Sequence, residues 1–453
     1  MSAITLEQAA KWCNGKIDSR YADVTFLGAC NDSRKVQHGE LFVALTTETR
    51  DGNDFVPAAM EAGAAAALCS RCDGDYPAII VPDVRVALGD IARAERERLQ
   101  MKVVGITGSV GKSTTKEMIS LVLSKKYKTA KTPVNHNNDI GMPMAILSMP
   151  EDTEVGVLEM GMNHFKEMSY LTSIAQPDLA VIINIGTMHI EHLGSREGIL
   201  HAKMEILEGL RPEGKMVFSG DESLLWNLRQ SQPKTPVYFG TENMFCDVLG
   251  TDVQDYGDKI LFQASAFGES CQIMLPVEGR HFVSDALAAV AVGRLLEVPM
   301  REIAEALAEF QNLEGRMELL EEKGFSIIKD CYNAGPESMA ASLSVLGKRA
   351  GRRIAVLGDM LELGVGAPAE HYRIGRIAAM NADLIFALGP NAERVVSGAL
   401  TGGMPPRAVN AYSDMEKLTD DLIRRAKPGD VLLFKGSRGM KMESVLERFL
   451  KEK

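Results

Sequence analysis

The sequence lacks the features that mark membrane, secreted and nucleic-acid-binding proteins. No stretch reaches the ~18 uninterrupted apolar residues that a membrane span requires. The first residues, MSAITLEQAAKW, carry neither the basic region nor the apolar core of a secretory signal. The formal net charge is -11 and no basic block occurs, which argues against a nucleic-acid or anionic-membrane surface. We expect a cytoplasmic protein that acts as a monomer on small molecules.

Cysteine and repeat patterns point to no further class of protein. The seven cysteines are scattered, and the close pair Cys69 and Cys72 has no second pair or nearby histidine to complete a zinc site. We interpret the cysteines as buried free thiols. No internal repeat or low-complexity tract occurs, so 453 residues of which 45% are hydrophobic predict roughly three ordinary domains.

Short apolar segments alternate with helical stretches along the chain, which predicts an α/β protein. We expect a small N-terminal α/β domain over residues 1–100, which ends in a charged helix over 87–100. A central domain with a mostly parallel sheet would span 101–312, and a C-terminal Rossmann-like domain 313–453. Ligands of open α/β sheets bind beyond the carboxyl ends of strands, so the polar residues there are the candidates.

The segment VVGITGSVGKSTTKEM, residues 103–118, reads as a strand, a glycine-rich loop and a helix. The loop lacks the first glycine of G-x-x-x-x-G-K-[ST], because Ile106 stands there, but it fits the shorter G-x-x-G-K-S over 108–113. Loop N–H groups would face a bound phosphate, Lys112 would add a charge, and Ser113 or Thr114 could ligate magnesium. An ordinary turn before an amphipathic helix is the alternative.

Two residues at strand ends are candidate metal ligands. Glu159 closes the strand VGVLE at the sheet edge where the phosphate loop is expected, and a hard carboxylate oxygen suits magnesium there. His189 follows the strand end VIINIG and could take a second metal position or contact substrate. The alternatives are an exposed acid at a strand end and an ordinary loop histidine.

Lys203 lies on the apolar stripe of a predicted helix. In GILHAKMEILEGL the positions Ile199, Ile206, Leu207 and Leu210 define the stripe, and Lys203 is four residues after Ile199. A buried lysine tends to be neutral, and a neutral amine can react with carbon dioxide to form a carbamate that ligates metal. The alternative is a side chain that reaches from the stripe edge into water.

Taken together, several ordered motifs resemble the Mur ligases. They are GSVGKS, TPVNHNNDIGMP, LEMG, HAKMEI, DCYNAGPESM and LGDMLELG, with NDSRKVQHGELFVAL near the start and LLFKGSRGMKME near the end. The resemblance covers nearly the whole chain. Within the family, NNDIGMP, YNAGPESM and GDMLELG resemble the member that adds D-alanyl-D-alanine, and not the one that adds the third amino acid.

The resemblance implies three domains and an ATP-dependent, magnesium-dependent amide ligase. The expected substrates are UDP-N-acetylmuramoyl-tripeptide, ATP and D-alanyl-D-alanine, and the expected process is peptidoglycan precursor synthesis. The N-terminal domain would hold the UDP-sugar, the central domain ATP, and the C-terminal domain would close over ATP and help to bind the dipeptide.

The resemblance also implies residue roles. Lys112, Lys203 and His189 would be catalytic, and Ser113, Glu159, His189 and a carbamylated Lys203 would hold metal. The ATP-binding residues would be Gly108, Ser109, Gly111, Lys112, Ser113, Thr114, His281, Asp285, Arg316 and Asp330. The substrate-binding residues would be Asp32, Ser33, Arg34, Asn135, Asn137, Asn138, Tyr332, Asn333, Lys435 and Arg438.

The chain departs from the family pattern at a few positions. The family usually has glycine near Thr47, asparagine at Phe282 and Asp285, and asparagine at Gly335. Asparagine both donates to and accepts from adenine, whereas an ionised Asp285 can only accept, so we expect altered recognition of the base.

The predicted reaction proceeds through an acyl phosphate. The terminal carboxylate of the tripeptide would attack the γ-phosphate of ATP, and the dipeptide amine would then displace phosphate. Three alternatives remain open from the sequence: a family ligase with another acceptor, including folate-polyglutamate or third-residue addition, a non-catalytic UDP-sugar sensor, and a simple P-loop kinase.

Overall fold

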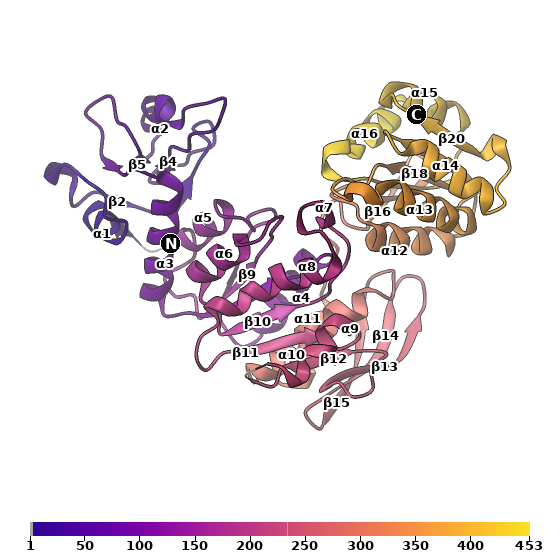
Figure 1. Ribbon diagram of the computed structural model, residues 1–453, viewed down its shortest axis with the longest axis horizontal. Helices are drawn as coiled ribbons and strands as arrows, with labels where there is room; N and C mark the ends of the chain where they lie inside the picture. The colour runs from indigo at the N-terminus through magenta and orange to yellow at the C-terminus, as the bar shows by residue number, and fades with distance from the viewer. Residues whose placement is uncertain (1–2, 233) are drawn as a thin grey trace.

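The computed structural model describes residues 3–232 and 234–453, and it folds into three α/β parts (Figure 1). The N-terminal and C-terminal parts lie at opposite ends of the view, with the central part between them. The sequence therefore predicted the fold class correctly. None of the helices in the described residues combines the length and the apolar character needed to cross a bilayer.

The N-terminal part is built on a four-stranded parallel sheet of order β3-β4-β5-β6, beside a separate antiparallel pair, β1 and β2. Its strands are β1 (Ile4–Thr5), β2 (Thr25–Phe26), β3 (Ala29–Cys30), β4 (Leu41–Val43), β5 (Ala66–Cys69) and β6 (Ala78–Ile80). Its helices are α1 (Leu6–Trp12), α2 (Val56–Glu61) and α3 (Val84–Leu99). Helix α3 begins three residues before the predicted start because the Asp83 side chain caps it, accepting the N–H groups of Arg85 and Val86.

The central part contains a nine-stranded sheet of order β15-β14-β13-β12-β11-β10-β7-β9-β8. Its strands are β7 (Lys102–Thr107), β8 (Thr129–Lys131), β9 (Val155–Glu159), β10 (Leu179–Ile182), β11 (Lys215–Ser219), β12 (Val237–Gly240), β13 (Val248–Asp255), β14 (Ile260–Ala266) and β15 (Glu269–Leu275). The pairs from β8 to β13 are parallel, and β14 pairs antiparallel with β13 and β15. The helices are α4 (Lys112–Ser124), α5 (Gly141–Leu147), α6 (Glu167–Ala175), α7 (Ile190–Leu193), α8 (Arg196–Met204), α9 (Ser223–Trp226), α10 (Phe282–Leu295) and α11 (Met300–Ala308).

The C-terminal part has a six-stranded sheet of order β16-β17-β21-β18-β19-β20, parallel except for the edge strand β16. Its strands are β16 (Glu318–Glu322), β17 (Phe325–Asp330), β18 (Arg353–Gly358), β19 (Leu384–Leu388), β20 (Val409–Tyr412) and β21 (Val431–Lys435). Its helices are α12 (Pro336–Gly347), α13 (Ala367–Asn381), α14 (Ala392–Thr401), α15 (Met415–Arg425) and α16 (Met442–Glu452).

Strand β7 is buried on both faces, and its alternate residues face different cores. Val104 and Ile106 belong to a hydrophobic cluster shared with α4, α10 and the C-terminal part. Val103 belongs to a second cluster, which joins α6 and the N-terminal α3. The phosphate loop therefore starts from a strand held between two cores.

Helix α3 joins the N-terminal and central parts. Arg96, fully buried on α3, donates from Nε to the carbonyl of Ala175 (2.9 Å) and from Nη2 to that of Gln176 (2.8 Å). These carbonyls lie at the end of α6, where helix acceptors lack internal partners. Arg96 also meets Asp178 at 3.3 Å.

Replacing Arg96 with Met should leave these carbonyls and Asp178 without their donor. We expect a loss of about 2 kcal/mol, seen in calorimetry as a Tm lower by about 5 °C. Arg93 on the same helix makes only a 3.7 Å contact with Asp90, so Arg93→Met is the control and should change Tm little. Equal Tm values for the two variants would contradict this role of Arg96.

Candidate active site

The glycine-rich loop connects β7 to α4 as predicted, and two of its glycines are sterically required. A Cβ on Gly108 would lie 2.2 Å from Ile183 Cγ1. Gly111 has φ 88° and caps α4, and a Cβ there would lie 2.6 Å from Asp285 Oδ1. The loop therefore passes close to its neighbours and leads directly into a helix N-terminus, the usual setting for a bound phosphate.

Asn184, which was not among the predicted site residues, fixes the conformation of the loop. Its side-chain oxygen accepts the N–H groups of Ser109 (2.9 Å) and Val110 (3.0 Å), and its Nδ2 donates to the Val110 carbonyl (2.8 Å). The signal was present, because Asn184 is the first polar residue after β10 at the edge of the sheet.

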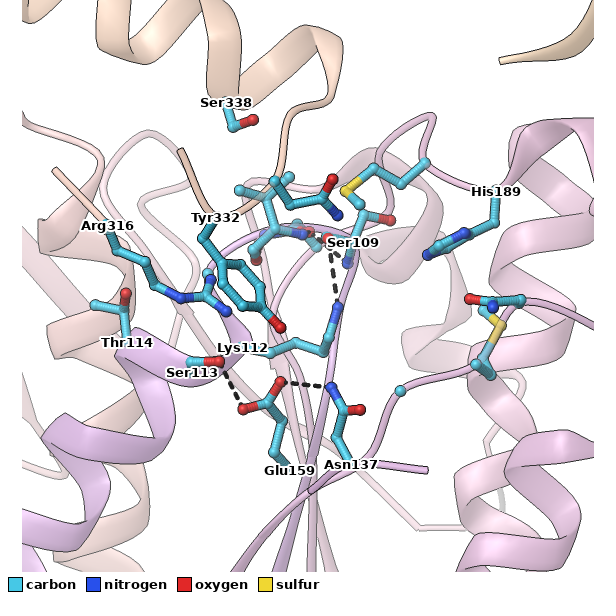
Figure 2. A pocket seen from close by; sticks show the side chains of 18 of the residues that line it. Ser109, Lys112, Ser113, Thr114, Asn137, Glu159, His189, Arg316, Tyr332 and Ser338 are labelled. Atoms are coloured by element: carbon cyan, nitrogen blue, oxygen red, sulfur yellow. Dashed lines mark hydrogen bonds between the residues drawn. The ribbon is translucent and has the colours of Figure 1, made fainter. Parts of the chain in front are cut away.

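Lys112, Ser113, Glu159 and Asn137 converge at the end of the loop (Figure 2). The Ser113 hydroxyl donates to Glu159 Oε2 (2.6 Å), and Asn137 Nδ2 donates to Oε1 (2.9 Å). Lys112 Nζ turns back to the carbonyl of Gly108 (2.7 Å). Both oxygens of the Glu159 carboxylate therefore accept hydrogen bonds, one from Ser113 and one from Asn137.

Glu159 is ionised although it is buried. Burial opposes its charge, but Lys112, the Ser113 hydroxyl and Lys116 outweigh burial and hold its pKa below the ordinary value. Lys116 is fully buried on α4, with its Nζ 3.8 Å from Glu159 and 2.8 Å from the Thr132 carbonyl that accepts its hydrogen bond. The position of Lys116 in the sequence did not predict this contact.

Lys203 faces inward, as its helical spacing predicted, and only 2% of its surface is exposed. Burial, followed by the nearby charge of Lys112, lowers its pKa well below the ordinary value. Within the described residues its amine makes no hydrogen bond. A neutral amine is the form that a carbamate requires, but the carbamate itself stays a prediction.

His189 lines the same cavity as the phosphate loop, and Figure 2 shows its ring pointing inward. Burial and the charge of Lys112 lower its pKa, although the carboxylate of Glu362 opposes this. The imidazole is therefore neutral at pH 7 and can serve as a ligand or a base.

The C-terminal part supplies the opposite wall. The Arg316 guanidinium stacks 3.9 Å from the centre of the Tyr332 ring. Lys435 is buried and donates to Asp330 (2.5 Å) and to the Asn333 carbonyl (3.0 Å). These five residues, all predicted at the site, line the same cavity as the phosphate loop.

Asp285 is only partly ionised at neutral pH. Asp285 is buried on α10, the Thr115 hydroxyl donates to it (2.7 Å), and burial raises its pKa to about 7. A carboxyl group that holds its proton near neutrality both donates and accepts, as asparagine does. The sequence could not reveal this, because the ionisation depends on how deeply the folded chain buries the carboxyl group.

The other departures from the family pattern fit their surroundings. A Cβ on Gly335 would lie 2.8 Å from Met188 Cγ, so a larger residue at 335 would displace Met188. Phe282 is buried and packs on His281 and Phe310, with ring centres 4.3 Å and 6.3 Å apart. His281 itself is exposed and opens to the cavity. For Thr47 the structure gives no contact with the cavity.

One cavity of about 930 Å³ unites these groups. It runs from the phosphate loop to Arg85 and Val86 at the start of α3, so all three parts contribute to its lining. Of the predicted site residues, those on the lining are Ser109, Gly111, Lys112, Ser113, Thr114, Asn137, Asn138, Glu159, His189, His281, Asp285, Arg316, Asp330, Tyr332, Asn333 and Lys435.

The remaining predicted residues lie off the lining. Gly108 and Lys203 sit behind it, and Asn135 is exposed with φ 69°. Asp32 accepts both bonds from the Arg34 guanidinium (2.9 and 2.8 Å), next to Ser33 in the N-terminal part. Arg438 pairs with Glu443 (2.7 Å).

The side chains of Ser113 and Glu159 are suitable ligands for a magnesium ion that binds together with a nucleotide. Ser113 and an ionised Glu159 offer the hard oxygen ligands that magnesium prefers. Across residues 3–232 and 234–453 no three His, Cys, Asp or Glu side chains form a metal cage. A metal here would therefore need the oxygen atoms of bound phosphates or a modified lysine to complete its shell.

These features define a nucleotide-dependent enzyme of the three-domain ligase type, and the chain belongs to the Mur ligase family. Family models match in three places: "Mur ligase family, catalytic domain" over residues 23–96, "Mur ligase middle domain" over 106–293, and "Mur ligase, glutamate ligase domain" over 315–438. The resemblance seen in the sequence is confirmed.

Curated proteins and solved structures are similar to this chain over nearly its full length. The chain is 38% identical to UDP-N-acetylmuramoyl-tripeptide–D-alanyl-D-alanine ligase of Bacillus subtilis (strain 168), covering 98% of this chain and 97% of that protein. A crystal structure of MurF from Acinetobacter baumannii superposes with a TM-score of 0.90 at 32% identity, covering 100% of this chain and 99% of that one. MurF from Thermotoga maritima in complex with ADP gives 0.81 at 32% identity, with 94% and 97% covered.

Replacing Asp285 with Asn should remove a pH-dependent cost to stability. The folded protein holds this proton up to about pH 7 and the unfolded chain only to about 3.8, so the wild type loses stability as pH rises between those values. Above pH 7 the variant should be more stable, by on the order of 3 kcal/mol. Calorimetry from pH 5 to pH 8 measures this, and a variant-to-wild-type difference in Tm that does not grow with pH would contradict it.

Proposed function

We propose that the protein is an ATP-dependent ligase of peptidoglycan precursor synthesis, which joins UDP-N-acetylmuramoyl-tripeptide to D-alanyl-D-alanine. The observation that carries this proposal is one cavity in which a phosphate loop, an ionised Glu159 and the C-terminal Arg316 and Lys435 converge. The chain is similar over nearly its full length to the ligase of this name from Bacillus subtilis and to MurF from Acinetobacter baumannii. We also infer a cytoplasmic monomer.

The chemistry explains why ATP is needed. A carboxylate and an amine do not condense at neutral pH, because the departing oxygen is a poor leaving group. An oxygen of the tripeptide carboxylate attacks the γ-phosphorus and ADP leaves, which gives an acyl phosphate. The uncharged dipeptide amine then attacks the carbonyl carbon, phosphate leaves with the activated oxygen, and the nitrogen loses a proton.

The side chains of the cavity supply positioning and charge. Lys112 and the N–H groups of the loop neutralise the transferring phosphoryl group, and Arg316 approaches from the C-terminal side. Ser113 and Glu159 would hold magnesium, which supplies further positive charge to the phosphate oxygens when bound. Lys203 and His189 would complete the metal surroundings, as the resemblance implies.

The UDP-sugar is assigned to the N-terminal part. Asp32, Ser33 and Arg34 would meet the uridine nucleotide, while the peptide would enter the cavity past Arg85. Arg34 holds Asp32 in its charged form, with a pKa of about 2. Asn137 and Asn138 would contact the peptide near the phosphate loop, whereas Asn135 would act from outside the lining.

A substrate-omission assay tests the proposal. The protein is incubated with magnesium and ATP, UDP-N-acetylmuramoyl-tripeptide and D-alanyl-D-alanine, and each is left out in turn. Phosphate release should need all three, and the UDP product should gain the mass of one dipeptide less water. Binding of the UDP-sugar without ATP turnover would identify a sensor, and a product with another acceptor would identify a different ligase.

Replacing Lys112 with Met should abolish turnover, because the transferring phosphoryl loses its nearest cation. We expect a kcat lower by on the order of 1,000-fold, comparable to other lost transition-state contacts. Lys125→Met, just beyond the same helix, removes only an outer pair with Glu309 (2.8 Å) and is the control. Near-normal phosphate release by Lys112→Met would refute this role.

A further inference from the structure

The loop that carries His189 meets Glu362 of the C-terminal part through two contacts. The Glu362 carboxylate contacts Nδ1 of His189, and the Glu362 carbonyl accepts the backbone N–H of Glu191 (3.3 Å). Both the side chain and the backbone of Glu362 therefore dock on this loop. His189 and Glu362 are 173 positions apart in the chain.

The backbone on both sides is shaped for this close approach. His189 has φ 63° and Glu362 has φ 61°, a left-handed conformation that residues other than glycine rarely adopt. Gly364 has φ 53°, and a Cβ there would lie 3.3 Å from both Cα and Cβ of Glu191. Strained conformations of this kind persist where the surrounding structure enforces them and are common at functional sites.

The Glu362 carboxylate determines which nitrogen of His189 carries the proton. A neutral imidazole has one N–H, and a carboxylate can accept a hydrogen bond but not donate one. Nδ1 beside Glu362 must therefore bear the proton, and Nε2 keeps a free lone pair. The His189 ring points into the cavity (Figure 2), where the amines of Lys112 and Lys203 are nearby.

We propose that Glu362 is a positioning residue, which fixes His189 as the Nδ1–H tautomer and presents the Nε2 lone pair to the cation bound in the cavity. The inference rests on the proposed function, because that reaction gives His189 its use. It also links the chemistry to domain docking, since the carboxylate that orients His189 comes from the C-terminal part. A carboxylate behind a ligating histidine orients the ring and raises its basicity in the same way at metal sites.

Nitrogen-15 NMR of the histidine side chains in the full-length protein tests this directly. The chain has eight histidines, and His189→Gln identifies the resonance of interest. In the wild type, Nδ1 of His189 should be protonated and Nε2 unprotonated. In Glu362→Ala no acceptor remains beside Nδ1, so the Nε2–H tautomer should become populated, and kcat should fall by roughly 10–100-fold with little change in the KM of the UDP substrate.

Two further variants distinguish the orientation of the His189 ring from the docking of the C-terminal part on the central part. Lys348→Gln removes another contact between the parts, the 2.6 Å pair with Asp255, and should leave the His189 tautomer unchanged. Gly364→Ala keeps the carboxylate but crowds Glu191, and should shift the tautomer partly toward Nε2–H.

The tautomer of His189 is measured independently of the ligase activity. Three results would overturn the inference: a wild type with the proton on Nε2, an unchanged tautomer in Glu362→Ala, and an equal shift in Lys348→Gln. An Nδ1–H tautomer that depends on Glu362, in a protein without ligase activity, would support the inference about His189 and count against the proposed function.

Discussion

The charge of Glu159 is the constraint on which the rest of the site depends. A carboxylate buried at the end of β9 stays ionised because Lys112, Ser113 and Lys116 offer charge and a hydrogen bond from α4. Those groups are in place because the glycine loop turns directly from β7 into α4. Any change that moves α4 away from β9 would therefore affect the phosphate loop and the metal ligand together.

The cavity requires all three parts of the chain. The central part alone supplies the phosphate loop, but the wall opposite it comes from Arg316 to Lys435, and the far end from Arg85 on α3. The contacts that join the N-terminal and C-terminal parts to the central part differ in burial. Arg96 on α3 is buried and bonded to the end of α6, whereas the C-terminal part meets the His189 loop through exposed polar contacts such as Thr187 with Glu337 (3.1 Å).

The sequence predicted the parts of the site that follow from local pattern. A strand, a glycine loop and a helix placed Lys112 and Ser113, a strand end placed Glu159, and helical spacing turned Lys203 inward. The same spacing misjudged the segment after Lys203, because α8 ends at Met204 and a 3-10 helix (Glu205–Gly209) takes over. There the Thr172 hydroxyl donates to the carbonyl of Ile206 (2.7 Å), which the sequence could not show.

The missed features all arise from contacts between distant segments. The sequence did not predict the contact of Glu362 with His189. The raised pKa of Asp285 depends on burial, which outweighs the lowering effect of the Thr115 hydrogen bond. Asn184 could have been found, since it stands at a strand end, yet its task of holding the loop is visible only when β7 and β10 lie side by side.

The central claim is that the tripeptide carboxylate is activated by phosphoryl transfer in this cavity, and an isotope-transfer experiment tests it most directly. UDP-N-acetylmuramoyl-tripeptide labelled with oxygen-18 in its terminal carboxylate is turned over with ATP and D-alanyl-D-alanine, and the released phosphate is analysed by mass spectrometry. The account predicts one oxygen-18 atom in each phosphate. Release of phosphate without oxygen-18 would contradict activation through an acyl phosphate.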